Sequence, residues 1–141
     1  MLRKSIKYFF IFLLMLPFVT AFSQEPSKEQ MEFEKKMRET IDKAVETYES
    51  DFDLEPWQAF YVDSILTHNM GAMSAEMMEL GKSRVENQDI YQAVTDKWNE
   101  RTYEAMRAVL NDQQWAKYLK GGAAKDKKYR DKREAKRQVG K

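Results

Sequence analysis

The 141-residue chain contains no cysteine and only one histidine, His68. Without a thiol it can form no disulfide and offers no thiol nucleophile. A single imidazole also argues against zinc sites of the ordinary type and against the common nucleophile–base pairs of hydrolases. The carboxylates are spread along the chain as solvation would place them, and nothing favours a catalytic pair. The sequence therefore predicts a protein that is not an enzyme and uses no cofactor.

The chain has one long apolar run, which is too short to span a bilayer. It extends from Tyr8 to Val19, about a dozen residues where a spanning helix needs roughly 20. Positive residues precede the run, and Ala21 and Ser23 follow it as the small residues of a signal-peptidase site. We therefore expect residues 1–23 to be a signal peptide cleaved near Ser23 and Gln24. The mature protein should then lie in an exported compartment, without stable membrane insertion.

Charge is divided unevenly along the chain. Residues 24–119 contain 11 Lys or Arg against 20 Asp or Glu, whereas residues 120–141 contain 10 against 3. The body is therefore acidic and the tail is basic. Such a tail could bind an acidic client, an anionic membrane or nucleic acid, fold back on its own body, or remain solvated. Export argues against nucleic acid as a partner.

Glycine and proline are scarce, with five and three in the whole chain, and no segment alternates with period two. These features predict an all-α protein. We expect an elongated four-helix, hairpin-type domain over residues 24–120. Ser27 and Gln30 should cap the first helix, and a turn should follow at residues 50–53. Gly121 and Gly122 should end the fourth helix and leave residues 121–141 partly helical or disordered.

The other helix boundaries follow from residues suited to starts and stops. Pro56 suits the first position of the second helix, which should end near Leu80 at Gly81. The third helix should run from about Gln88 to Val109. The residues expected on buried faces recur at helical spacing; they are Phe33, Met37, Ile41, Val45, Tyr48, Trp57, Tyr61, Ile65, Leu66, Met70, Met73, Met77, Leu80, Ile90, Val94, Trp98, Ala105, Val109, Trp115, Tyr118 and Leu119.

The second predicted helix is rich in methionine. His68, Met70, Met73, Met77 and Met78 lie within eleven residues. Thioethers and an imidazole are soft ligands that suit Cu(I). Methionines are equally suited to a core, or to an adaptable surface that accepts many apolar partners. The sequence leaves all three interpretations open.

Two five-residue segments echo each other. Leu54-Glu55-Pro56-Trp57-Gln58 and Leu110-Asn111-Asp112-Gln113-Gln114 each place a glutamine four residues after a leucine, where a new helix should begin. A polar residue with a glutamine three positions later forms a capping box, while the leucine packs beneath the turn. The key residues of this pattern are Leu54, Gln58, Leu110, Asn111 and Gln114.

The two segments resemble the L-T-x-x-Q motif of the Spy/CpxP family of periplasmic proteins. Glu55 and Asn111 stand where the family prefers threonine, and Asn111 is the better cap of the two. The resemblance extends to the helical plan of the body. It implies a thin, curved homodimer of helical hairpins that holds unfolding proteins without ATP or takes part in envelope stress responses. The zinc-binding relatives use histidine-rich segments, which this chain lacks.

The leading hypothesis is a periplasmic holdase that binds unfolded or misfolded envelope proteins. Met70, Met73, Met77 and Trp98 are its candidate client contacts. One alternative is a metal-responsive protein, either copper-buffering or zinc-associated, with His68 and the same three methionines as ligands. Another is a regulatory module that docks one envelope partner through its basic tail.

Overall fold

The computed structural model describes residues 25–140, so the predicted signal peptide, residues 1–23, lies outside the described part of the chain. Helices make up 88% of the described residues, which contain no strand, and this confirms the all-α class. The elements are α2 (Lys28–Phe52), α3 (Pro56–Lys82), α4 (Gln88–Val109), α5 (Asp112–Tyr118), the π-helical segment η1 (Leu119–Ala123) and α6 (Ala124–Val139). None of the helices in residues 25–140 combines the length and apolar character needed to cross a bilayer.

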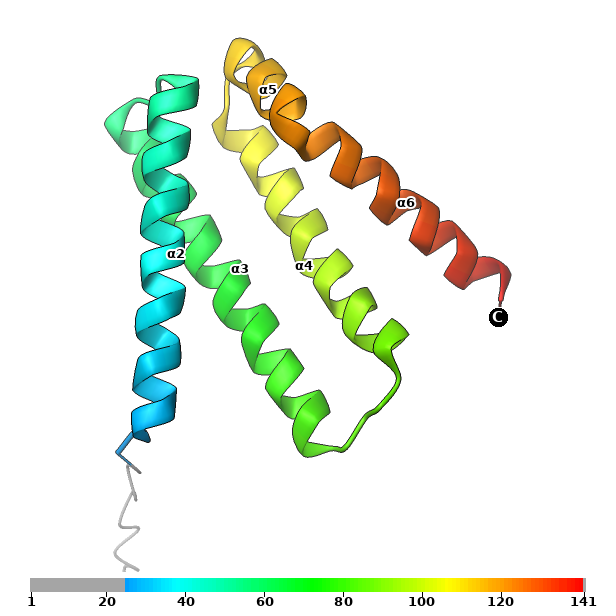
Figure 1. Ribbon diagram of the computed structural model, residues 1–141. Helices are drawn as coiled ribbons and strands as arrows, with labels where there is room; N and C mark the ends of the chain where they lie inside the picture. The colour runs from blue at the N-terminus through cyan, green and yellow to red at the C-terminus, as the bar shows by residue number, and fades with distance from the viewer. Residues whose placement is uncertain (1–24, 141) are drawn as a thin grey trace, which may run out of the picture.

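The helices form a hairpin with a further helix on each side. Helices α3 and α4 make the antiparallel hairpin, α2 packs against α3, and α6 folds back beside α4 (Figure 1). The α2–α3 and α4–α5 turns lie at one end of the molecule, and the α3–α4 connection lies at the other. The four helices expected for residues 24–120 correspond to α2, α3, α4 and α5.

Local capping signals explain where the helices start and stop. The Ser27 side chain accepts the Gln30 N–H at 3.1 Å, which is one half of the predicted capping box. The Gln30 side chain donates to Glu34 at 3.4 Å and does not reach back to Ser27. Helix α2 continues through the expected turn to Phe52 and ends at Asp53, whose φ is 58°. Helix α3 continues through Gly81 to Lys82, because the left-handed residue that follows it is Arg84, with φ 54°.

The buried core is small and lies where α2, α3 and α4 meet. It consists of Ile41, Val62, Leu66, Met106 and Leu110. Ile41, Val62 and Met106 expose 1% of their surface or less. Because the bundle is thin, few side chains are enclosed on every side, and many apolar residues remain partly in solvent.

Four residues expected on buried faces are in fact exposed. Phe33, Trp57, Tyr61 and Ile90 expose between 41% and 53% of their surface. On α3, the buried face is formed by smaller side chains such as Ala59, Val62 and Asn69. The prediction that Trp57 and Tyr61 lie on the buried face of α3 was therefore wrong. Phe33 lies in the first part of α2, which diverges from α3 (Figure 1).

The basic tail is more regular than expected. Residues 124–139 form helix α6, and Gly121 and Gly122 redirect the helical course without ending it. Gly122 has φ 128°, a conformation that favours glycine because a Cβ would be strained there. Its composition gave α6 little to bury, but ion pairs with α4 hold it in place. Arg130, for example, donates to Glu100 at 3.1 Å.

Candidate functional site

The two glutamines of the repeated motif meet at the end of the molecule that carries both turns. Gln58 and Gln114 expose 3% and 6% of their surface. The Gln58 Nε2 donates to Gln114 Oε1 at 2.7 Å, and the Gln114 Nε2 donates to Gln58 Oε1 at 2.9 Å. The motifs are 56 residues apart in sequence, yet they form one reciprocal amide pair.

Each glutamine side chain also forms hydrogen bonds with backbone groups of both motifs. The Oε1 atoms of Gln58 and Gln114 accept the backbone N–H groups of Glu55 and Asn111 at 2.9 and 3.0 Å. Each Nε2 group also donates to a backbone carbonyl beside the other motif. Gln58 Nε2 donates to the Val109 carbonyl at 3.0 Å, and Gln114 Nε2 donates to the Asp53 carbonyl at 3.3 Å. Each of these carbonyls directly precedes the leucine of the other motif. The arrangement satisfies both amides fully and ties the two turns together.

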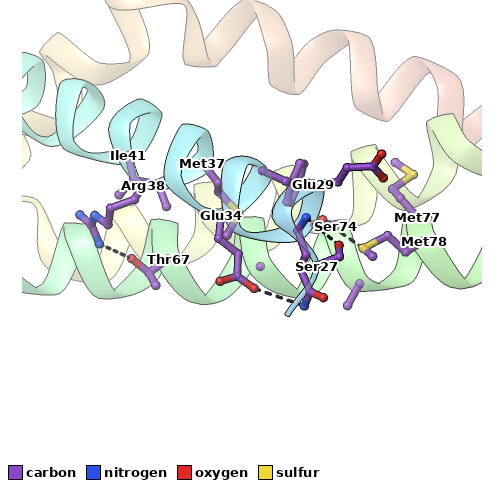
Figure 2. Close-up of a pocket in the computed structure, with 14 residues that line it drawn as sticks. Ser27, Glu29, Glu34, Met37, Arg38, Ile41, Thr67, Ser74, Met77 and Met78 are labelled. Atoms are coloured by element: carbon purple, nitrogen blue, oxygen red, sulfur yellow. Dashed lines mark hydrogen bonds between the residues drawn. The ribbon is translucent and has the colours of Figure 1, made fainter. Parts of the chain in front are cut away.

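An apolar groove lies between α2 and α3, and we call it the outer groove (Figure 2). Its volume is about 860 Å³, and its apolar lining comes mainly from Phe33, Met37, Ile41, Met77 and Met78. Phe33 and Met78 expose 48% and 51% of their surface. The outer groove is therefore an apolar surface that no other part of residues 25–140 covers.

Small residues on α3 keep the outer groove open. Gly71, Ser74 and Ala75 face it where α2 and α3 separate. A Cβ placed on Gly71 would meet no atom within 4 Å. Glycine inside a helix costs about 1 kcal/mol relative to alanine. Gly71 therefore lowers the stability of α3 and leaves the outer groove open beside it.

A charged clamp closes one end of the outer groove. Arg38 of α2 donates to Asp42 at 2.8 Å and to Thr67 of α3 at 3.1 Å, and it also pairs with Asp63 of α3. The hydrogen bonds to Asp63 and Asp42 raise the pKa of the Arg38 guanidinium further above its ordinary value. Glu29 and Glu34 are also on the lining. The groove therefore offers fixed charge beside an apolar floor.

A second space, the inner groove, is lined by α3 and α4, by the end of α2, and by the chain from α5 to α6. Its volume is about 710 Å³, and its lining includes Met70, Met73, Tyr103 and Tyr118. Burial, followed by the nearby Tyr48, raises the pKa of the Tyr118 hydroxyl, which therefore remains protonated. Helix α6 supplies part of the wall through residues such as Tyr129, so this groove is partly closed by the chain's own basic tail.

The predicted methionine set is divided between the two grooves. Met77 lines the outer groove, whereas Met70 and Met73 line the inner one. His68 precedes Met70 by two residues, about 200° around the helix, and its ring lies 6.3 Å from that of Trp98. His68 and the methionines therefore do not converge. Within residues 25–140, no group of three or more histidine, cysteine or acidic side chains could hold a metal ion.

Trp98, the remaining predicted client contact, lines neither groove. Its indole N–H donates to Glu76 at 2.8 Å. The guanidinium of Arg101 lies 4.5 Å from the ring centroid. The hydrogen bond to Glu76 links α4 to α3 within the hairpin, whereas Arg101 lies on the same helix as Trp98.

An exposed aromatic cluster at the start of α3 was not anticipated. Trp57, Phe60 and Tyr61 expose 51%, 67% and 53% of their surface. The Tyr61 ring makes edge contacts with both neighbours, at centroid distances of 6.2 Å to Trp57 and 5.8 Å to Phe60. The sequence places these three aromatics within five residues, but the prediction assigned Trp57 and Tyr61 to the buried face and did not include Phe60.

Comparison of the chain with protein-family models, with curated proteins and with solved structures finds no match in any of the three. The resemblance to the Spy/CpxP family therefore rests on the two motifs and the helical plan.

Proposed function

We propose that this protein is a periplasmic, ATP-independent holdase of the Spy/CpxP type, which binds unfolded envelope proteins in the outer groove. The observation that carries the proposal is the uncovered apolar lining of that groove, formed by Phe33, Met37, Met77 and Met78. An apolar surface left in water is a candidate site for association. Methionine adapts its shape to different partners, which suits clients without a common sequence.

The size of the outer groove favours weak and reversible binding. A volume of about 860 Å³ accommodates a few apolar side chains of an extended client. Each such side chain gains about 1.5–3 kcal/mol when it is fully buried, and the client loses conformational freedom in return. Binding of this strength can be reversed without a nucleotide.

The proposed assembly is a homodimer. The exposed cluster of Trp57, Phe60 and Tyr61 supplies an apolar surface distinct from both grooves. Aromatic residues are enriched in the contacts that contribute most to protein interfaces. We therefore assign the dimer contact to this cluster. Sedimentation should show a dimer for the chain from Gln24 onward and a monomer for Phe60→Ser, whereas a monomer for the unaltered chain would reject the assignment.

The holdase proposal can be tested by filling the outer groove from Gly71. Light scattering of an aggregating client should fall when the chain from Gln24 onward is added without ATP or metal. Gly71→Phe should abolish this suppression because its ring would enter the open space beside Gly71.

Gly71→Ala is the matched control. It changes the same backbone position but adds only a methyl group, so it should retain suppression and stabilise α3 by about 1 kcal/mol. Equal activity of the phenylalanine and alanine variants, with both shown to be folded, would rule out the outer groove. No suppression by the unaltered chain would reject the holdase function itself.

A further inference from the structure

One face of helix α6, its inner face, carries arginines that form ion pairs with α4. Arg133 and Arg137 both pair with Asp96 at 2.6 Å, and Arg130 pairs with Glu100 at 3.1 Å. The Asp96 side chain is only 7% exposed. Arginine suits this position because its planar group can donate several hydrogen bonds to carboxylates in a fixed geometry.

The outer face of the same helix has a different composition. Lys125, Lys128, Lys132 and Lys136 recur at intervals of three or four residues, which places them on one side of α6. All four are exposed, and none forms an ion pair with any residue in the range 25–140. The arginines of α6 therefore bind the body, as does Lys127, which pairs with Glu100 at 3.2 Å, whereas these four lysines do not.

We call these four lysines the lysine face. Tyr129 and Val139 flank it and expose 50% and 89% of their surface. The Lys125 ammonium lies 6.0 Å from the Tyr129 ring centroid. From Lys125 to Lys136 the face is about 17 Å long at 1.5 Å per residue. Lysine beside an aromatic and an aliphatic residue is the composition of helices that lie at a bilayer surface.

We propose that the lysine face of α6 binds the surface of a phospholipid bilayer that carries anionic headgroups. The face is extended and convex, so it can meet many headgroups at once. The outer face holds no arginine that would grip a single phosphate with two hydrogen bonds. Its few apolar residues make the contact electrostatic and peripheral, without insertion of the helix.

The charge of the rest of the protein determines which side of the molecule faces the membrane. Residues 24–119 hold 20 acidic against 11 basic residues, so an anionic surface repels the body. Only the side of the molecule that presents α6 can approach such a membrane closely. Neither groove is lined by any of the four lysines. The outer groove is lined by α2 and α3, and α4 lies between α3 and α6 (Figure 1). This contact does not depend on the holdase proposal.

Co-sedimentation with lipid vesicles tests the proposal. The chain from Gln24 onward should bind vesicles of three parts phosphatidylcholine to one part phosphatidylglycerol, but not vesicles of phosphatidylcholine alone. Raising the salt to about 1 M should release it, because the screening length then falls to about 3 Å. A lysine near an anionic surface contributes about fivefold in affinity, so Lys128→Gln with Lys132→Gln should weaken binding roughly 25-fold.

The matched control is Lys35→Gln with Lys36→Gln, which removes the same charge from two exposed lysines of α2. This pair should leave vesicle binding unchanged, and circular dichroism should show both double variants to be as helical as the parent. Equal losses in the two double variants would overturn the proposal, because binding would then depend on net charge alone. Absence of binding to the mixed vesicles, or tighter binding to duplex DNA in the same buffer, would also overturn it.

Discussion

Helix α4 is held on its two sides by different kinds of interaction. Against α2 and α3 it buries Met106 beside Ile41 and Val62 in an apolar core. Against α6 it presents Asp96 and Glu100 to arginines. The apolar side depends on the exclusion of water and is largely indifferent to salt. The charged side depends on ionisation and on ionic strength, so conditions can alter one side without the other.

The charged side also contains a buried hydrogen-bond donor that has no partner. The Arg130 Nη2 is buried and has no hydrogen-bond partner, although the residue pairs with Glu100. Gln58 and Gln114, in contrast, use every donor and acceptor of their amides. Buried charge requires compensation for its lost hydration, so ion pairs of this kind give position more than stability. We therefore expect α6 to detach more readily than the hairpin opens.

The largest effect should come from the apolar side. Met106→Ala removes most of a side chain that is fully buried, and it should lower the free energy of unfolding by about 2–5 kcal/mol. Urea unfolding followed by circular dichroism measures this. Met31→Ala is the control, because Met31 is 49% exposed and should change stability by less than about 0.5 kcal/mol. Similar losses in the two variants would mean that the core is not where the structure places it.

A smaller effect should follow from breaking the amide pair. Gln58→Ala leaves the Gln114 amide, the Glu55 N–H and the Val109 carbonyl without their partner. Each buried orphan costs about 1–3 kcal/mol, reduced where water can enter, so we expect a total loss of about 2–4 kcal/mol.

The second half of that test is the double variant Gln58→Ala with Gln114→Ala. Because the two amides bind each other, the double variant should lose less than the sum of the single losses. Denaturant unfolding of the four proteins gives this coupling directly. Strict additivity would show that the glutamines act separately, as ordinary caps of their own helices.

The smallest effect should be the response of the charged side to acid. Burial would raise the pKa of Asp96, but hydrogen bonds from Arg133, Arg137 and Gln92 outweigh it and lower the pKa from 3.8 to about 2. The lowered value stabilises the folded state above pH 3.8, and this contribution is lost as the pH falls towards 2. We expect it to be about 1–2 kcal/mol after screening by solvent.

Other carboxylates titrate over the same range, so the unaltered protein must be compared with Asp96→Asn. The difference in unfolding free energy between the two proteins should be constant above about pH 5 and should shrink as the pH approaches 2. Amide hydrogen exchange should show the loss in α6 before the α3–α4 hairpin. A difference that does not change with pH would show that the Asp96 ion pairs do not stabilise the fold through ionisation.

The same contrast explains how much could be predicted from the sequence. Capping is local, so Ser27 and Asn111 marked helix starts correctly. The pairing of Gln58 with Gln114 joins positions 56 residues apart, and nothing within either motif specified its partner. The start caps predicted at Ser27 and Asn111 were right, whereas Gly81 and Gly121 do not end their helices as expected. The contact between the motifs emerged only from the fold.

Errors arose where neighbours, and not the helix itself, decided burial. Trp57 and Tyr61 have the size of core residues, but Ala59 and Asn69 face inward because the adjacent helices lie close. The order of α6 was missed for a related reason. Its composition shows little to bury, and its partner Asp96 lies 37 residues before Arg133. The methionines were divided between two grooves because α3 faces the first part of α2 along one side and the space enclosed by α2, α4 and α6 along another.

The reciprocal glutamine pair also constrains the order in which the domain can be completed. The Gln58 side chain cannot form its amide pair until Gln114, which lies 56 residues later, is present. A chain that is synthesised from its N-terminus therefore leaves the Gln58 amide without this partner until residue 114 is present. A chain interrupted before α5 would leave the two turns unjoined.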